Sequence, residues 1–316
     1  MNNNKKVTIV GGGAWGIALA AAAARAGSNV LLYSRREQGL LPDNVHRSAD
    51  LKEAAEHARL LLLAVPSDAV ARVAAGLGDH LNGSHYVVHG VRGLSGTKLD
   101  TISQVVRRET PVRRVGAIGG PAIVEDLVAG RPNVIVCGSR FPEVLEAFTQ
   151  ALGSKALRVY PTQDLVGLEW ASALVGCLMI AVGFAQGLGM TPGLIAAFLS
   201  RSIGEAARIA AAAGGDEQTL LGLAGYGDLL AAASQESRPE VMLGHRLASG
   251  GSRTSAISQA KEHIEALELI PRIAAFCEEH KVRAPIFRAL NDGIGSDRGG
   301  EALLADLMTQ PMESRA

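Results

Sequence analysis

Residues 6–16 read KVTIVGGGAWG, a short run of mostly β-branched and basic residues followed at once by a glycine cluster. Three of the glycines have the spacing G-x-G-x-x-G, and an alanine-rich helix is expected over residues 17–25. Such glycines allow a tight bend and the close approach of a pyrophosphate, which lies where the free N–H groups of the helix N-terminus favour anions. Strand, turn and helix in this order predict a dinucleotide-binding unit. The residues of the turn expected to contact the cofactor are Gly11, Gly13, Ala14, Trp15 and Gly16.

The next expected strand, residues 29–33, ends in Ser34, Arg35 and Arg36. An acidic residue here would bond the ribose 2′-hydroxyl of NAD, but the first acidic residue is Glu37, which comes late for that role. Two arginines and a serine suit a 2′-phosphate instead. The sequence therefore favours NADP over NAD, with a solvated basic loop as the competing interpretation.

Further strands are expected after the first two, with helices between them, at 60–65, 86–89, 115–118, 133–137 and 157–160. The first of these is a continuous apolar run, which is typical of a parallel strand buried on both faces. Val65 and Pro66 end it, at the sheet edge where cofactors bind, and are expected to line that site. The pattern predicts an α/β fold with an N-terminal Rossmann doubly wound sheet over residues 1–162.

Strand signals nearly vanish after residue 162, which predicts an all-α C-terminal domain over residues 163–316 for substrate binding and dimerisation. We expect the two domains to abut, with the substrate between them. The expected helices are 164–187, 192–214, 217–223, 227–235, 239–249, 254–264, 267–280, 284–293 and 300–309.

The composition narrows the class of protein. The 31 basic and 31 acidic residues of the 316 cancel, so no global charge favours nucleic acid. No His, Cys or Asp cluster has metal-ligand spacing, so no metal site is expected. Three cysteines without paired spacing indicate free thiols, and a signal peptide is not recognisable, so a cytoplasmic protein is predicted. The uncharged run ASALVGCLMIAVG, residues 171–183, is shorter than a membrane span needs and predicts a buried core helix.

Six stretches of motif follow one another between residues 9 and 230, within a similarity that covers nearly the whole chain: IVGGGAWGIALA (9–20), LLLAVPSDAV (61–70), RGLSGTKL (92–99), GGPAIVEDLVAGRPNVIV (119–136), LRVYPTQDLVGLEWASAL (157–174) and TLLGLAGYGDLL (219–230). In this order they resemble bacterial NAD(P)-dependent glycerol-3-phosphate dehydrogenases, within the wider 6-phosphogluconate dehydrogenase-like superfamily. The resemblance implies an NAD(P)-dependent dehydrogenase acting on a CH–OH or C=O group, which interconverts dihydroxyacetone phosphate and sn-glycerol 3-phosphate. It also implies a small, phosphorylated substrate and a homodimer.

The sequence departs from that family where a proton donor is expected. The family places two lysines near the ketone oxygen, and their positions here hold Arg92 and Val175, the latter followed by Gly176. An arginine keeps the charge but is too basic to release a proton. The losses indicate an altered catalytic site. Two alternatives stay open: a reductase of a different carbonyl or imine in a more apolar pocket, and a non-catalytic NAD(P)-binding sensor or partner protein.

Several polar residues are candidates for catalysis. Asp228 matches the family's glycine-aspartate motif and is a candidate acid, although a helix N-cap is an equal alternative. Tyr226 and His89 are alternative proton donors, and each also suits a purely structural role. Glu169 lies six residues before Val175 and is a candidate carboxylate, with a structural role at the domain junction as the alternative.

The remaining candidates are charged. Arg92 and Arg238 are expected to bind an anionic group of the substrate, and Arg92 can also polarise a carbonyl. Arg238 follows Ser237, as in the family's Ser-Arg-Asn motif, but Pro239 replaces the asparagine. Arg201 is expected in an internal ion pair. Glu265 falls where the family has a glutamate and is grouped with the cofactor residues.

Overall fold

The structure is a computed structural model, and it describes residues 5–37, 39, 41–235, 237–249, 253–258 and 264–295. The chain forms two compact units, Met1–Ser172 and Ala173–Ala316, which divide inside one long helix. Each unit is described by itself below.

Unit 1 is built on an eight-stranded sheet in the order β3-β2-β1-β4-β5-β6-β7-β8. All neighbouring pairs are parallel except β6 and β7. The order reverses between β1 and β4, which is the switch point of a doubly wound sheet. The predicted Rossmann fold is confirmed. The strands are β1 (Lys6–Val10), β2 (Asn29–Tyr33), β3 (Val45–Ser48), β4 (Leu60–Leu63), β5 (Tyr86–His89), β6 (Arg114–Gly119), β7 (Asn133–Ser139) and β8 (Leu157–Thr162).

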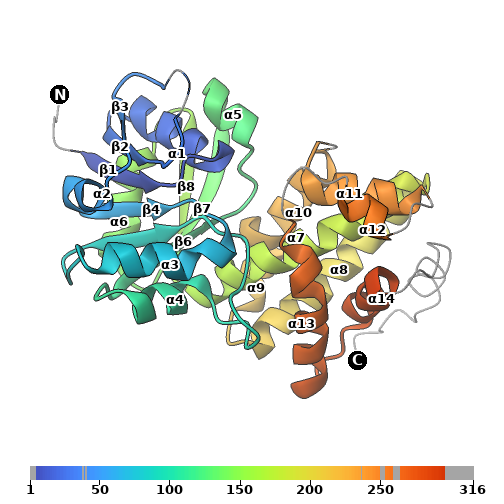
Figure 1. Cartoon of the computed structure of the whole chain (residues 1–316). Helices are drawn as coiled ribbons and strands as arrows, with labels where there is room; N and C mark the ends of the chain where they lie inside the picture. The colour runs from blue at the N-terminus through green and yellow to red at the C-terminus, as the bar shows by residue number, and fades with distance from the viewer. Residues whose placement is uncertain are drawn as a thin grey trace. The chain divides into compact units, whose positions relative to one another are not determined.

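Helices cover both faces of this sheet (Figure 1). One layer holds α1 (Ala14–Arg25), α5 (Val124–Ala129) and α6 (Pro142–Leu152), and the other holds α2 (Leu51–His57), α3 (Ser67–Gly78) and α4 (Ile102–Glu109). Because side chains alternate along a strand, Ile9 packs into the core under α1 and α6, whereas Val10 packs into the core under α3 and α4. A sheet with two apolar faces explains why its central strands are continuous apolar runs.

Strand β3 is the one strand of the sheet that the sequence does not predict. Its segment, VHRS, exposes both middle residues and has no apolar run. It pairs only with β2, at the edge of the sheet, and is held by these backbone hydrogen bonds together with the burial of its two end residues, Val45 and Ser48. Its position brings Arg47 beside the end of β2.

Helix α7 (Leu165–Gly187) contains the uncharged run and crosses the boundary between the two units. The prediction of a buried core helix is confirmed, but the argument from length is wrong, because the helix has 23 residues and is long and apolar enough to span a membrane. Burial, and not length, indicates a core helix, because 94% of an apolar 18-residue stretch of α7 is buried inside the structure.

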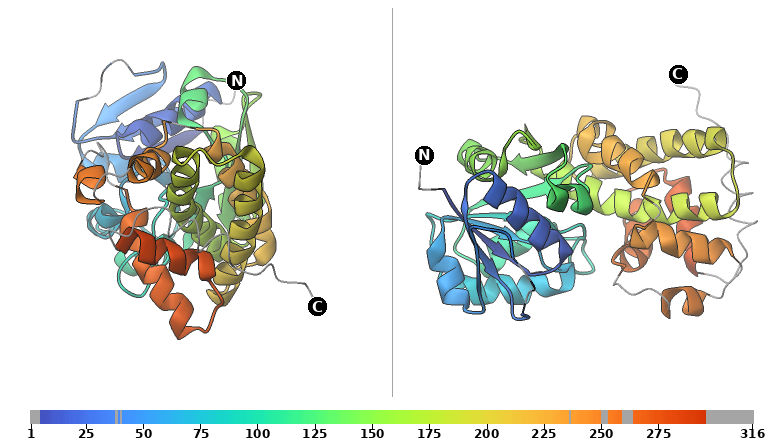
Figure 2. Two further views of the ribbon diagram at one scale, coloured as in Figure 1. Left: turned by 90° about the vertical axis from the view of Figure 1, so that its right-hand side faces the viewer. Right: turned by 90° about the horizontal axis from the view of Figure 1, so that it is seen from above.

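Unit 2 contains only helices among its described residues (Figure 2). They are α8 (Pro192–Ala212), α9 (Glu217–Leu221), the π-helix η1 (Leu223–Gly227), α10 (Asp228–Ala233), α11 (Pro239–Ala248), α12 (Arg253–Ser258), α13 (Ala266–Glu279) and α14 (Pro285–Gly295). The two helices expected at 217–223 and 227–235 are instead joined by η1. Of the helix expected at 254–264, residues 253–258 are helical, and the helix expected at 300–309 lies outside the described residues.

Candidate cofactor and catalytic sites

The glycine turn after β1 is fixed by close contacts of the backbone. Gly11 has a positive φ of 127°, and a Cβ there would collide with the carbonyl oxygen of Ala64. A Cβ at Gly16 would collide with the carbonyl oxygen of Gly11. A Cβ at Gly13, by contrast, would meet nothing within 4 Å. Two glycines are therefore required by the fold, and the third leaves open space where a ligand can approach.

The N-terminus of α1 has the features of an anion site. Its N-cap is Gly13, which supplies no side-chain cap, and the first turn carries no acidic residue. The buried Nε1 of Trp15, in this first turn, has no hydrogen-bond partner among the described residues. Unsatisfied N–H donors and the helix dipole favour a negatively charged group here. The residues present thus fit the pyrophosphate of a dinucleotide.

The end of β2 lies against this turn, because the N–H of Gly11 donates to the carbonyl oxygen of Tyr33 at 3.0 Å. Ser34 is buried, and its hydroxyl donates to the carbonyl oxygen of Arg36 at 2.9 Å. This small loop leaves the side chains of Arg35 and Arg36 exposed. The Nε of Arg47 donates to the same carbonyl at 3.0 Å, so a third guanidinium, which sequence analysis missed, joins the loop.

The end of β4 completes this edge of the sheet. Val65 Cγ1 lies 3.2 Å from the position that a Cβ on Gly11 would occupy, so Val65 borders the turn. Pro66 is the N-cap of α3. Glu265, which sequence analysis grouped with these residues, belongs to unit 2, where it directly precedes α13.

A buried hydrogen-bonded cluster in unit 1 contains the first catalytic candidate. The carboxylate of Glu169, which is 2% exposed, accepts from Ser103 N at 2.8 Å, Ser103 Oγ at 2.7 Å and His89 Nε2 at 2.9 Å. Ser103 lies in the first turn of α4, so the carboxylate caps that helix. His89 ends β5 and belongs to the same cluster, which a single sequence does not reveal.

The imidazole of His89 also faces the loop that follows β5. Its Nδ1 accepts from the N–H of Val91 at 3.4 Å while Nε2 donates to Glu169, a pattern that suits the neutral imidazole. Arg92, the next residue, is half-buried. The cluster therefore anchors the loop that carries Arg92.

Unit 2 brings together two of the other candidates. Arg238 Nη1 lies 3.6 Å from Asp228 Oδ1, and its Nε lies 3.4 Å from Glu240 Oε2. The side chains of Asp228 and Arg238 are 2% and 10% exposed, respectively. Asp228 is the first residue of α10 and Gly227 is the N-cap, so the N-cap alternative for Asp228 is wrong. Glu240, the third member, was missed because the proximity of these three side chains is not visible in the sequence.

The glycine-rich motif before Asp228 forms the π-helix η1, which contains Tyr226. A Cβ at Gly225 would collide with the carbonyl oxygen of Leu220, so the tight turn needs glycine there. Single π-turns inside helices often occur at functional sites. Tyr226 is half-buried, two residues before Asp228.

The position where the resemblance places a lysine is apolar. Val175 is 0% exposed, and a Cβ on the adjacent Gly176 would meet nothing within 4 Å. Both belong to unit 2, within α7.

The three cysteines and Glu205 are titratable residues that are buried outside these clusters. The three cysteines are free and buried, and burial raises the pKa of each thiol, that of Cys277 to about 12. Glu205 of α8 is buried and accepts from the N–H groups of Ile286 at 3.0 Å and Phe287 at 2.7 Å, so it caps α14. Burial raises its pKa to about 7, opposed by these hydrogen bonds and then by the charges of Arg208 and Arg201. The charge of Arg201 makes the smallest of these contributions to the pKa of Glu205, and the internal ion pair expected for Arg201 stays a prediction.

Comparison with known proteins connects both halves to one family. The model of the NAD-dependent glycerol-3-phosphate dehydrogenase N-terminus matches residues 6–40 and 37–144, and that of the C-terminus matches residues 164–297. A glycerol-3-phosphate dehydrogenase [NAD(P)+] of Rhodospirillum rubrum is 27% identical over 326 residues, covering 97% of this chain and 93% of that protein. One from Salinibacter ruber is 28% identical over 324 residues, covering 96% and 95%.

Solved structures show the same fold. The crystal structure of glycerol-3-phosphate dehydrogenase from Coxiella burnetii matches with a TM-score of 0.89 at 24% identity, covering 97% of this chain and 99% of that one. The enzyme from Saccharomyces cerevisiae matches with a TM-score of 0.85 at 18% identity, covering 96% and 99%.

Proposed function

Because the chain belongs to the NAD-dependent glycerol-3-phosphate dehydrogenase family, we propose that it is an NAD(P)-dependent oxidoreductase of a CH–OH or C=O group with an altered catalytic site. Its first candidate reaction is the interconversion of dihydroxyacetone phosphate and sn-glycerol 3-phosphate. The observation that carries the proposal is the glycine turn at the switch point of the sheet, with an uncapped helix N-terminus beside it. The nicotinamide supplies or accepts the hydride when the cofactor is bound.

The proposed cofactor is NADP, bound through Gly11, Gly13, Ala14, Trp15 and Gly16. Arg35 and Arg36 are exposed beside the turn, where two guanidinium groups can pair with a 2′-phosphate. The double variant Arg35→Ala/Arg36→Ala tests this. It should weaken NADPH binding about 100-fold or more and NADH binding much less, because only NADPH carries the phosphate. Arg140→Ala, an exposed arginine after β7, is the matched control, and equal loss of both cofactors would contradict the NADP assignment.

The proposed catalytic roles follow the two clusters. Asp228, in its protonated form, donates the proton to the ketone oxygen, with Tyr226 as the alternative donor. Arg238 binds the anionic group of the substrate, and Glu240 orients its guanidinium. Arg92 supplies a fixed positive charge that polarises the carbonyl. Glu169 acts through His89 as a positioning residue, because its carboxylate is enclosed by Ser103 and His89.

These roles predict separable effects of substitution. Loss of the general acid should lower kcat by about 10²–10⁴-fold, so Asp228→Asn and Tyr226→Phe distinguish the two donors. The donor is the residue whose variant loses kcat and flattens the pH profile, while the other variant retains both.

The second candidate function is a reductase of a different carbonyl or imine in a more apolar pocket. It is favoured by Val175, which is fully buried where the resemblance places a lysine. It predicts turnover of an unphosphorylated carbonyl compound with no turnover of dihydroxyacetone phosphate.

One assay separates the candidates. The purified protein is mixed with NADPH or NADH and dihydroxyacetone phosphate, and the cofactor absorbance is followed; a panel of unphosphorylated ketones and imines is measured in parallel. Consumption with dihydroxyacetone phosphate supports the first candidate, and consumption only with the panel supports the second. Cofactor binding by fluorescence without any turnover would overturn both in favour of a non-catalytic sensor or partner protein.

The proposed assembly is a homodimer, and the proposed compartment is the cytoplasm. Exposed large apolar side chains on unit 2 support association, namely Leu194, Leu221, Leu223, Leu230 and Met242. Free buried cysteines suit a reducing compartment. Light scattering of the purified protein tests the dimer, which a monomeric mass at micromolar concentration would contradict.

A further inference from the structure

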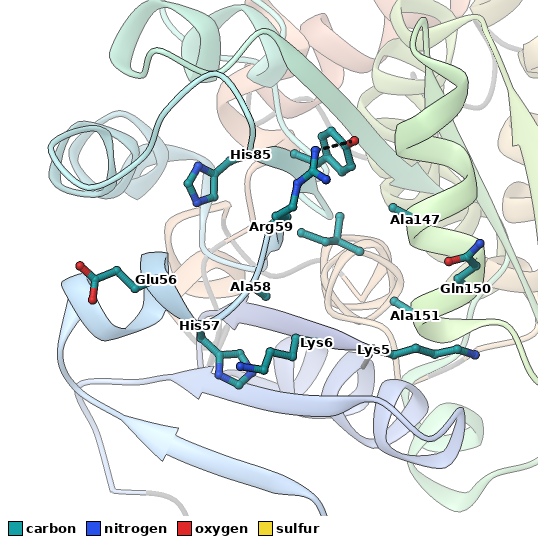
Figure 3. A pocket seen from close by; sticks show the side chains of 12 residues that line it. Lys5, Lys6, Glu56, His57, Ala58, Arg59, His85, Ala147, Gln150 and Ala151 are labelled. Carbon is teal, nitrogen blue, oxygen red and sulfur yellow. Dashed lines mark hydrogen bonds between the residues drawn. The ribbon is translucent and has the colours of Figure 1, made fainter. Parts of the chain in front are cut away.

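A basic cavity of about 490 Å³ opens in unit 1 at the amino ends of β1, β4 and β5 (Figure 3). Lys6 begins β1 and Lys5 precedes it, Arg59 precedes β4, and His85 precedes β5. Helix α2 contributes His57 and helix α6 contributes Gln150. The glycine turn lies beyond Val10, at the carboxyl end of β1, so the cavity and the candidate cofactor site occupy opposite edges of the sheet.

The fixed charges of the cavity are predominantly positive. Lys5, Lys6 and Arg59 carry three positive charges, against the single negative charge of Glu56. Glu56 Oε1 also lies 4.0 Å from Nζ of Lys52, which is outside the cavity. Figure 3 shows the carboxylate of Glu56 directed away from the labelled cations. Among the described residues, no carboxylate lies within ion-pair distance of Lys5, Lys6 or Arg59. The net charge of about two matches a phosphate dianion near neutral pH.

Arg59 is held in place before any ligand arrives. Its Nε donates to the carbonyl oxygen of Ser84 at 3.1 Å, and its Nη2 donates to the hydroxyl of Tyr86 at 3.0 Å. The guanidinium carbon lies 4.9 Å from the centre of the Tyr86 ring. A side chain ordered in advance loses less entropy on binding than a free one, which suits a binding site better than a solvated surface.

His57 lines the cavity and has a lowered pKa. Its pKa lies below the ordinary value, first because of burial and then because of the positive charges of Lys6 and His46, which outweigh Glu53. A hydrogen bond to the carbonyl oxygen of Asn29 acts in the opposite direction. The other titratable groups around it are Lys5, Arg59, His85 and Glu56 in this cavity, and Asp50 and Lys52 beside it at the start of α2. An anion bound here would raise the pKa of His57.

We propose that this cavity is a second anion site, which binds a phosphate group through Lys5, Lys6 and Arg59. Lysine ammonium groups bind phosphate as point charges, and Arg59 contributes a fixed one. The volume exceeds that of phosphate itself and lies in the range of small-molecule sites, so a phosphomonoester with a small organic group fits as well as inorganic phosphate. The site is independent of the proposed oxidoreductase activity, because none of its residues belongs to the glycine turn or to the catalytic candidates.

The experiment follows the imidazole signals of His57 and His85 by NMR while inorganic phosphate or glycerol 2-phosphate is added to the full-length protein. His57→Gln and His85→Gln assign the signals. We expect saturable shifts and a rise in the pKa of His57. Tighter binding of inorganic phosphate would indicate a site for the free ion, and tighter binding of glycerol 2-phosphate a site for a phosphomonoester. Both results support a phosphate site.

Variants and a salt control decide the interpretation. Lys5→Gln/Lys6→Gln should weaken phosphate binding about tenfold or more, because each lysine contributes a charge-assisted interaction. Both lysines are exposed, so folding should be preserved, and Lys155→Gln, another exposed lysine, should bind as the wild type does. Equal shifts in chloride at the same ionic strength, or unchanged binding in the double variant, would overturn the proposal.

Discussion

Two buried glutamates cap a helix N-terminus, one in each compact unit, and their surroundings differ. Glu169 of α7 accepts from the N–H and hydroxyl of Ser103 in α4, and Glu205 of α8 accepts from the N–H groups of Ile286 and Phe287 in α14. Glu169 alone also binds an imidazole, that of His89. One glutamate is therefore linked to a group that can carry a proton, while the other only holds a helix. Burial and apolar surroundings do not separate these roles; hydrogen-bond partners do.

The largest effect on stability is expected from Glu169→Ala. It leaves three buried donors without an acceptor, namely Ser103 N, Ser103 Oγ and His89 Nε2. The free energy of unfolding should fall by about 3–5 kcal/mol, since breaking a buried hydrogen-bonded network strands its remaining members. Urea denaturation measures this. Glu146→Ala, an exposed glutamate on α6, should change it by less than about 0.5 kcal/mol, and a similarly small loss at Glu169 would show that the cluster does not stabilise the fold.

Sequence analysis found only one of these two glutamates, and the reason is general for this chain. The glycine turn is readable because Gly11, Gly13 and Gly16 are close together and obey a local steric rule. Glu169 was found through its spacing from Val175 and not through its partners, which lie 66 and 80 residues away, whereas Glu205 has no such neighbour in the sequence and its partners lie 81 and 82 residues away. Strand β3, and with it Arg47, was missed because edge pairing needs no apolar pattern. Local backbone rules were thus sufficient for the fold and the cofactor turn. The cluster around Glu169 depends on contacts between distant segments, and the pairing of Asp228 with Arg238, ten residues later, follows no local backbone rule either.

A somewhat smaller loss is expected from Glu205→Ala. Two buried backbone N–H groups at the start of α14 would lose their acceptor, which should lower the free energy of unfolding by about 2–4 kcal/mol. The same denaturation experiment applies, with Glu279→Ala at the exposed end of α13 as the control. If Glu205 only caps a helix, kcat/KM per folded molecule should be unchanged in the Glu205 variant and reduced in the Glu169 variant. A selective loss of kcat in the Glu205 variant would contradict this difference between the two glutamates.

The pH dependence of stability offers a third test. Burial raises the pKa of Glu205 to about 7, above its value in the unfolded chain. The native state therefore keeps the proton that the unfolded state releases, so this contribution is complete below the unfolded pKa of about 4.3 and is lost as the pH rises to about 7. The loss should be at most about 4 kcal/mol, because one pKa unit corresponds to about 1.4 kcal/mol and the two pKa values are about 2.7 apart.

Glu205→Gln isolates that contribution, since the amide does not titrate. The advantage of the wild type over this variant, measured by urea denaturation from pH 4.5 to pH 8, should shrink as the pH rises. A constant difference over this range would mean that Glu205 is ionised in the native state throughout, and its environment would then resemble that of an ordinary surface carboxylate.

The smallest effect on stability, and the sharpest test of the difference between the two glutamates, is expected from His89→Gln. The variant retains a donor for Glu169 but loses the Nδ1 acceptor for Val91 N–H, so stability should fall by only about 1 kcal/mol. If Glu169 acts through His89, kcat should nevertheless fall, with KM little changed and the pH profile altered, because the loop that carries Arg92 loses its anchor. A structural capping role would leave the pH profile of this variant unchanged. His89→Gln therefore separates helix capping, which both glutamates share, from positioning, which only Glu169 can perform.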